Sequence, residues 1–223
     1  MDKRVQIYMM THKPFTKPED PVYVPVHVGR KPWIKAHPDE KSPLLMYVGD
    51  DSGDNISAQN CYYSELTGMY WAWKNSDADY IGICHYRRYL LTHDGALFDQ
   101  RSVQKVLCSY DIITTKNLQL NFPYEEGFVH HHKKIYLDMT AQVVEELYPE
   151  YTNTFQRLVK EKHTYFGNML IAKKETYDAY MAWLFDILFA VQARVKVEEE
   201  DSYHRRIFGF LSEFLQYVWI VHN

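Results

Sequence analysis

The sequence has few cysteines, no long apolar run and no excess of positive charge. Its three cysteines, Cys61, Cys84 and Cys108, lie far apart and match neither a zinc-binding nor a redox motif. A net charge of −4 argues against recognition of a nucleic acid by bulk positive charge. A P-loop and a convincing cluster of metal ligands are also lacking, which disfavours a nuclease or a phosphotransferase.

The lack of long apolar segments bears on location. No apolar window approaches the length of a membrane-spanning helix. The first residues, "MDKRVQIYMM", are too briefly apolar for a signal peptide, and no small-residue cleavage site follows them. We therefore expect a cytoplasmic protein that at most associates peripherally with the inner face of the membrane.

Aromatic residues are abundant instead, at 16% of the chain with 19 tyrosines. In tyrosine-rich pockets the rings often stack on sugars or nucleobases. The plainer interpretation of the high aromatic content is an aromatic core. Composition alone favours the aromatic core.

Strand-like and helix-like segments alternate along the chain, which predicts a single α/β domain with a mainly parallel sheet. Buried central strands are expected at "VQIYMM", "DYIGIC", "DIITT" and "NMLIA", and a further strand within residues 20–28. One continuous helix is expected over residues 58–75, capped by Asn55 or Ser57. Residues 116–132 lack periodicity and are expected to form a long functional loop.

The stretch "DYIGICHYRRYL" directs His85, Tyr86, Arg87 and Arg88 off the end of a core strand. Ligands of open α/β sheets bind beyond the carboxyl ends of the strands, and one guanidinium group can bind two phosphate oxygens by parallel hydrogen bonds. A phosphate-binding role is therefore one hypothesis. The alternative is that the arginines form ion pairs with carboxylates such as Asp51 and Asp54.

Several segments in order along the chain resemble a known family. The segments "GDNIS", "ELTGMYWAWKN", "DYIGICHYRRYL", "GNMLIA" and "RRIFGFLSE" are similar to the bacterial capsular-polysaccharide glycosyltransferases catalogued as domain of unknown function 4422. The resemblance implies a GT-A-like, Rossmann-type fold over residues 1–223, with a nucleotide-sugar part at about 1–115 and an acceptor part at about 116–223. It also implies a hexosyltransferase, expected to be inverting, that uses a UDP-sugar, with galactofuranose among the candidates. Its acceptor would be a lipid-linked or oligosaccharide chain of a capsule, O-antigen or exopolysaccharide.

The motifs and strand ends together give a set of expected site residues. Donor binding is expected at Thr11, His12, Lys13, Asp54, Asn55, Ser57, His85, Tyr86, Arg87 and Arg88. The acceptor is expected to contact His132, from the "HHH" run, and Asn168. An inverting transferase needs a base for the acceptor hydroxyl, and Glu213 is our first candidate and Asp138 our second. Each of the two carboxylates has a structural ion pair as its alternative role.

No metal cofactor is expected. The one Asp-x-Asp sequence, Asp77-Ala78-Asp79, precedes its strand and so belongs to the edge of the sheet opposite to where ligands bind. The cationic cluster would replace a metal at the diphosphate. A magnesium or manganese ion at the acidic loop, held by Asp51 or Asp54, is the alternative. The rival function is a catalytically inactive nucleotide- or carbohydrate-binding partner of the same assembly machinery.

Overall fold

The computed structural model describes residues 3–223. The chain divides into two compact units, one containing residues up to Thr115 together with Met169–Met181, the other containing Lys116–Asn168 and Ala182–Asn223. Two separate segments therefore build each unit. The assignment of the whole chain to one domain stays a prediction.

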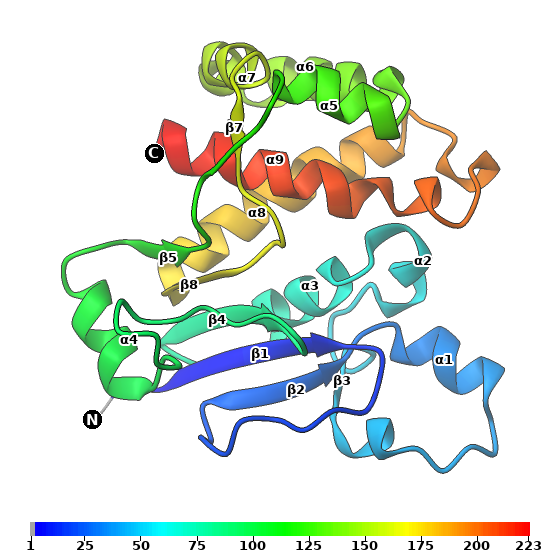
Figure 1. The fold of residues 1–223 in the computed structure, drawn as a ribbon. Helices are drawn as coiled ribbons and strands as arrows, with labels where there is room; N and C mark the ends of the chain where they lie inside the picture. Colours follow the sequence, from blue (N-terminus) through cyan, green and yellow to red (C-terminus); the bar gives the residue numbers. More distant parts are fainter. Residues whose placement is uncertain (1–2) are drawn as a thin grey trace. The chain divides into compact units, whose positions relative to one another are not determined.

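The first unit contains a six-stranded sheet with the order β3-β2-β1-β4-β8-β5 (Figure 1). Its strands are β1 (Val5–Thr11), β2 (Tyr23–His27), β3 (Val48–Gly49), β4 (Tyr80–His85), β5 (Ile112–Thr114) and β8 (Leu170–Lys173). The pairs β3–β2, β2–β1 and β1–β4 are parallel, and β8 runs antiparallel to both β4 and β5. The predicted α/β class and mainly parallel sheet are confirmed.

Side chains alternate along β1, so that the sheet has two differently covered faces. Val5, Ile7 and Met9 belong to a buried cluster that also includes Val103 and Leu107 of α4 (Gln100–Leu107). On the other face, Tyr8 meets the edge of Trp71 in α3 (Leu66–Asn75), with 5.7 Å between ring centroids. The sheet is thus covered by helices on both faces, and its loops remain at its ends.

Helix α3 lies unusually close to the sheet at Gly68. A Cβ atom at this position would come within 2.3 Å of the Met10 sulfur and 2.8 Å of a Val28 methyl carbon. The glycine therefore permits a helix–strand approach that a larger residue would obstruct.

Three structural expectations for the first unit are corrected. The helix expected over residues 58–75 is interrupted at Ser64, whose φ is 49°, so that η2 (Ser57–Gln59) and α2 (Asn60–Tyr63) precede the break and α3 follows it. Neither Asn55 nor Ser57 is its cap, since Ile56 holds the N-cap position of η2. The "DIITT" segment forms the half-buried edge strand β5 rather than a central strand.

The second unit is mainly helical. It contains α5 (Tyr124–His131), α6 (Lys134–Leu147), α7 (Thr152–Leu158), α9 (Ile207–His222) and the later part of α8 (Lys174–Gln192). Residues 116–132, expected to be a loop, instead form β6 (Leu118–Gln119) and α5. Strand β6 pairs with β7 (His163–Thr164) in a two-stranded sheet. The Tyr124 ring stacks on Phe214 at 4.2 Å, so α5 packs against α9.

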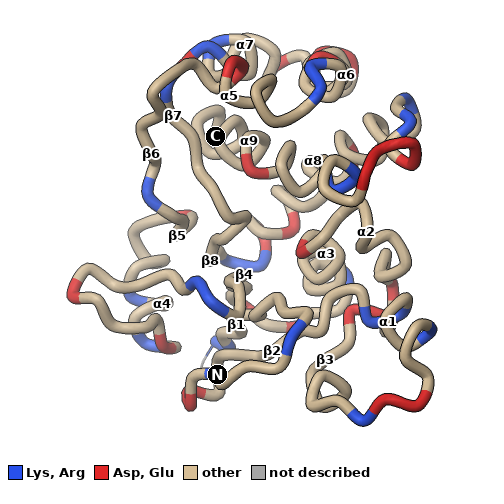
Figure 2. Tube along the Cα trace, turned by 45° about the vertical axis from the view of Figure 1, so that its right-hand side comes forward, with Lys and Arg blue, Asp and Glu red and all other residues tan. Residues whose placement is uncertain are grey.

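Short helices complete the chain. They are α1 (Arg30–Ala36), η1 (Pro43–Met46), η3 (Pro149–Tyr151), η4 (Val197–Glu199) and η5 (His204–Arg206). Figure 2 shows acidic and basic residues interspersed along the trace, apart from the acidic run at residues 198–201. Within residues 3–223, no helix combines the length and apolarity needed to cross a membrane.

Candidate functional site

Three histidines mark the carboxyl ends of adjacent parallel strands. His12 directly follows β1, His27 is the last residue of β2, and His85 is the last residue of β4. In the ladder, Thr11 pairs with His27 and Met10 pairs with His85. The prediction that His12 and His85 emerge at one edge of the sheet is confirmed. His27 was missed, although its place at the end of an expected strand is the same signal.

A tight turn carries the two arginines beyond β4. The backbone N–H groups of His85 and Arg88 each donate to the other residue's carbonyl over 3.1 Å, and the N–H of Tyr86 donates to Met10. Arg87 and Arg88 are exposed. The Arg87 guanidinium lies 4.8 Å from the centre of the Tyr86 ring, a cation–π distance. The turn therefore presents two cationic side chains on a backbone that is fixed to β1.

Aromatic rings surround this turn. Tyr86 makes edge contacts with His12 at 5.5 Å and with Phe15 at 5.9 Å between ring centroids. Phe15 also meets Tyr47 at 5.8 Å, and the Tyr47 hydroxyl donates to the Phe15 carbonyl. The arrangement offers rings beside positive charge, which suits a base or a sugar next to a phosphate.

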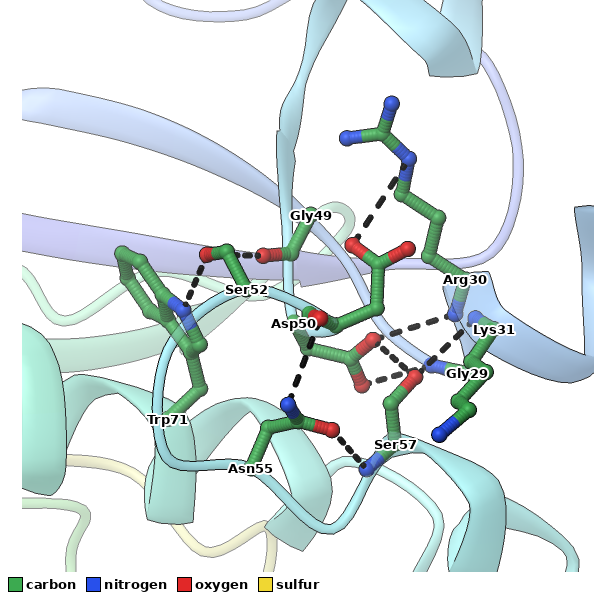
Figure 3. Close-up of polar contacts among 10 residues, drawn as sticks. Gly29, Arg30, Lys31, Gly49, Asp50, Ser52, Asn55, Ser57 and Trp71 are labelled. Carbon is green, nitrogen blue, oxygen red and sulfur yellow. Dashed lines mark hydrogen bonds and ion pairs between the residues drawn. The ribbon is translucent and has the colours of Figure 1, made fainter.

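Asp50 organises the loops on the β2–β3 side of the same edge (Figure 3). Its carboxylate is buried and accepts four hydrogen bonds, from the backbone N–H groups of Gly29 and Arg30 and from the hydroxyls of Ser57 and Thr67. Burial raises the pKa of Asp50, and the four donors oppose that rise. The four hydrogen bonds all come from the protein itself, so Asp50 has a structural role: it holds together the loops that supply the donors.

The loop that follows Asp50 is also held internally. The Asn55 amide donates to the carbonyls of Asp51 and Gly53, and Ser52 accepts a hydrogen bond of 2.8 Å from the Trp71 indole. Arg30 lies 3.9 Å from Asp51. Most polar groups of this acidic loop therefore have partners within the first unit (Figure 3).

His27 is buried in an environment that disfavours its charged form. Only 1% of the residue is exposed, and its Nδ1 atom has no hydrogen-bond partner among the described residues. Burial, and then the nearby Arg30 charge, lower the pKa of His27 to about 4, although Asp51 acts in the opposite direction. The imidazole is consequently neutral at physiological pH.

The remaining donor-site predictions fall into two groups. Thr11 and Ser57 are buried, and the Thr11 hydroxyl donates to the Lys13 carbonyl, so they shape loops. His12, Lys13 and Asp54 are exposed and accessible to a ligand. The roles of all these residues in binding a donor stay predictions.

The alternative partners proposed for the arginines lie elsewhere. Asp51 faces Arg30, and Asp54 accepts a hydrogen bond from the Tyr70 hydroxyl. Across residues 3–223, neither Arg87 nor Arg88 forms an ion pair with a carboxylate.

The Asp-x-Asp sequence lies at the opposite edge of the sheet, as predicted. Asp77 forms an ion pair with Arg4, and Asp79 accepts a hydrogen bond from the Arg4 backbone N–H. Both residues precede β4. Within residues 3–223, no group of three or more His, Cys, Asp or Glu side chains is arranged to hold a metal ion. Independence from a metal cofactor stays a prediction.

The second unit contains the residues expected to act on the acceptor. The Gly167 N–H donates a 2.6 Å hydrogen bond to Glu213 on α9, and Glu213 and His132 line a common pocket of about 400 Å³. Asn168 is buried; it donates to the Gly209 carbonyl and accepts from Ser212, so its observed role is to hold the turn. Asp138 is exposed, outside the pocket, and pairs with Lys134.

Comparisons with known proteins agree with this architecture. A solved structure titled "WbbM bifunctional glycosyltransferase", in its apo form, is similar with a TM-score of 0.82 and 26% sequence identity. The match covers 98% of this chain and 42% of that chain, so this chain spans less than half of the length of its structural relative. No curated protein gives a significant match. The family model described as a domain of unknown function, DUF4422, matches residues 6–223, and the chain therefore belongs to this family.

Proposed function

We propose that the protein is a glycosyltransferase that transfers a hexose from a UDP-sugar to a hydroxyl group of a growing surface polysaccharide. Family membership and the similarity to a structure titled as a bifunctional glycosyltransferase support this proposal. UDP-galactofuranose is among the candidate donors, and a capsule, O-antigen or exopolysaccharide chain is the candidate acceptor.

The observation that carries the proposal is the turn beyond β4. Arg87 and Arg88 are exposed there, at the edge where ligands of open α/β sheets bind, and His12 contacts Tyr86, the residue that precedes them. When a glycosyl group is transferred, the departing UDP gains negative charge on its phosphate oxygens. Two guanidinium groups would stabilise that charge by charge-assisted hydrogen bonds.

Transfer with inversion also requires a base that accepts the proton of the attacking hydroxyl group. Glu213 is our candidate, because it lies in a pocket and is oriented by the Gly167 N–H. Asp138 is the weaker candidate, since it is exposed and paired with Lys134 on the surface of α6.

Release of UDP tests the proposal. The full chain is incubated with a panel of UDP-sugars, with and without oligosaccharide acceptors, and UDP is quantified. Acceptor-dependent release that is lost in the Arg87→Ala/Arg88→Ala double variant would support it. Binding of UDP-sugars without turnover under every condition would favour the alternative, a catalytically inactive nucleotide- or carbohydrate-binding partner.

A further inference from the structure

The second unit contains a pocket whose walls are mostly aromatic. Its aromatic residues include Phe122 after β6, Phe128 in α5, Phe166 before Gly167, Tyr203 before η5 and Phe210 in α9. Its volume of about 400 Å³ is within the range of small-molecule sites, roughly 300–1,000 Å³. The pocket is therefore large enough for a small ligand.

Two of these rings are unusually exposed for their size. Phe166 is 45% exposed and Tyr203 is 44% exposed. Tyr203 lies nearly parallel to His132, with 5.9 Å between ring centroids and an interplanar angle of 10°, and Phe210 is 4.4 Å from the same imidazole. Tyr203, His132 and Phe210 pack on one another, and the Arg206 guanidinium lies 5.2 Å from the centre of the Tyr203 ring. The exposed parts of Phe166 and Tyr203 remain accessible to a ligand.

The polar groups of the pocket are few and fixed in position. Glu213 is held by the Gly167 N–H, in a turn whose next residue, Asn168, is itself bonded to α9. His132 Nδ1 is buried without a partner among the described residues. Burial, together with the charges of His204 and His131, lowers the pKa of His132 to about 4, so that the ring is neutral at pH 7.

This combination of groups discriminates between occupants. A hydrocarbon chain would cover the rings, but it would desolvate the Glu213 carboxylate and add no hydrogen-bond donor to the Gly167 N–H, which is unfavourable. A saccharide ring has an apolar face of C–H groups for an aromatic ring and hydroxyl donors for a carboxylate. The rings and the carboxylate together therefore favour a saccharide.

We propose that this pocket binds a saccharide ring of the acceptor, with Phe166 and Tyr203 covering its apolar face and Glu213 accepting hydrogen bonds from its hydroxyl groups. Only the identification of the saccharide as an acceptor rests on the proposed glycosyltransferase function. Binding of a saccharide in the pocket can be tested without turnover.

Saturation-transfer NMR on the full chain provides the test. The probes are methyl glycosides of galactose, galactofuranose, glucose, mannose and rhamnose. Tetramethylammonium and decanol are tested in parallel as a cationic ligand and a hydrocarbon ligand. We expect at least one glycoside to bind, with the largest transfer to the C–H protons of one face. Phe166→Leu and Tyr203→Ala should each weaken binding, and Glu213→Gln should weaken it about tenfold through loss of a charge-assisted hydrogen bond.

Matched variants outside the pocket control for general effects. Tyr110→Ala removes an aromatic ring that is 66% exposed in the first unit, and Glu145→Gln neutralises an exposed carboxylate on α6. Neither should change glycoside binding. Glu213→Gln retains an oxygen for the Gly167 N–H and Phe166→Leu retains apolar bulk, so both variants should keep the fold.

Titration with UDP separates this inference from the proposed function. Pocket-dependent glycoside binding without UDP binding would support the saccharide site and overturn the transferase. UDP binding without pocket-dependent glycoside binding would overturn the inference alone, as would pocket-dependent binding of only tetramethylammonium or decanol. Displacement of the glycoside by UDP-glucose but not by UDP would assign the pocket to a donor sugar and overturn the acceptor assignment.

Discussion

The hydroxyl group of Thr67 donates a 2.6 Å hydrogen bond to the buried carboxylate of Asp50. It thereby ties α3 to the loop that follows β3, and the same carboxylate fixes the start of α1 through the N–H groups of Gly29 and Arg30. Three segments beside the proposed donor site thus depend on one charged group.

Asp50→Asn should destabilise the protein by about 2–4 kcal/mol. The NH2 group of an asparagine would replace one accepting oxygen, so that some of the four N–H and O–H donors would lose their acceptor. The free energy of unfolding, measured by urea denaturation at pH 7, checks this value. Asp111→Asn, at an exposed position of the same unit, should change it by less than about 0.5 kcal/mol. Equal stability of the two variants would contradict the structural role.

Arg87→Ala and Arg88→Ala should each weaken UDP binding by about 1–3 kcal/mol, the range of a charge-assisted hydrogen bond. Calorimetric titration with UDP measures the effect. Arg101→Ala, an exposed arginine on α4, is the matched control and should bind UDP as the wild type does. Unchanged affinity in both turn variants would reduce the two arginines to surface residues.

Transfer activity should survive EDTA, because guanidinium groups in the β4 turn would neutralise the departing diphosphate without a metal. The assay compares UDP release in EDTA with release in added manganese. Complete loss in EDTA with recovery in manganese would instead require a bound ion. Asp51→Asn and Asp54→Asn would then show whether the loop after Asp50 holds it.

Stability should fall as the pH drops from about 6.5 to 4, in part because of His27. Its pKa is lowered to about 4 in the folded protein, so the unfolded chain binds the proton more readily over this interval. The contribution is on the order of 1–3 kcal/mol. Urea denaturation of His27→Gln at several pH values should show a shallower dependence than the wild type, whereas His93→Gln, at an exposed position, should not.

Ser64→Gly should stabilise the protein by about 1 kcal/mol. The φ of 49° and ψ of −127° at Ser64 are costly for a residue with a Cβ atom, and relief of that strain outweighs the added freedom of the unfolded chain. Ser64→Ala keeps the strain and serves as the control. A Ser64→Gly variant with a lower urea midpoint than Ser64→Ala would show that the backbone there is unstrained.

The break at Ser64 also illustrates what sequence patterns could not predict. Apolar residues continue on both sides of it, and propensity alone favours one helix over residues 58–75. The Asn60 amide donates to the Ser64 carbonyl within the segment, and a non-local bond from the Thr67 hydroxyl to Asp50 holds α3 in place beyond the break. Non-local bonds of this kind leave no periodic signal in the sequence.

Strand ends were predicted better than helix ends. Short runs of β-branched and aromatic residues that stop at polar residues indicated β1 and β4, and hence the shared edge of His12 and His85. Strand β5 was placed too centrally, because apolar content does not distinguish an edge strand from a central one when the rest of the sheet is unknown. The aromatic pocket of the second unit was not predicted, since its rings come from segments far apart in the chain.

Strand β8 has a consequence for synthesis of the protein on the ribosome. It pairs with β4, yet it follows only after the whole segment Lys116–Asn168 has been made. Synthesis at about 5–20 residues per second leaves the edge of β4 uncovered for on the order of ten seconds. An uncovered strand edge is a template for pairing with another chain. The nascent chain should therefore be most prone to aggregation, and most dependent on chaperones, in the interval between emergence of β4 and arrival of β8.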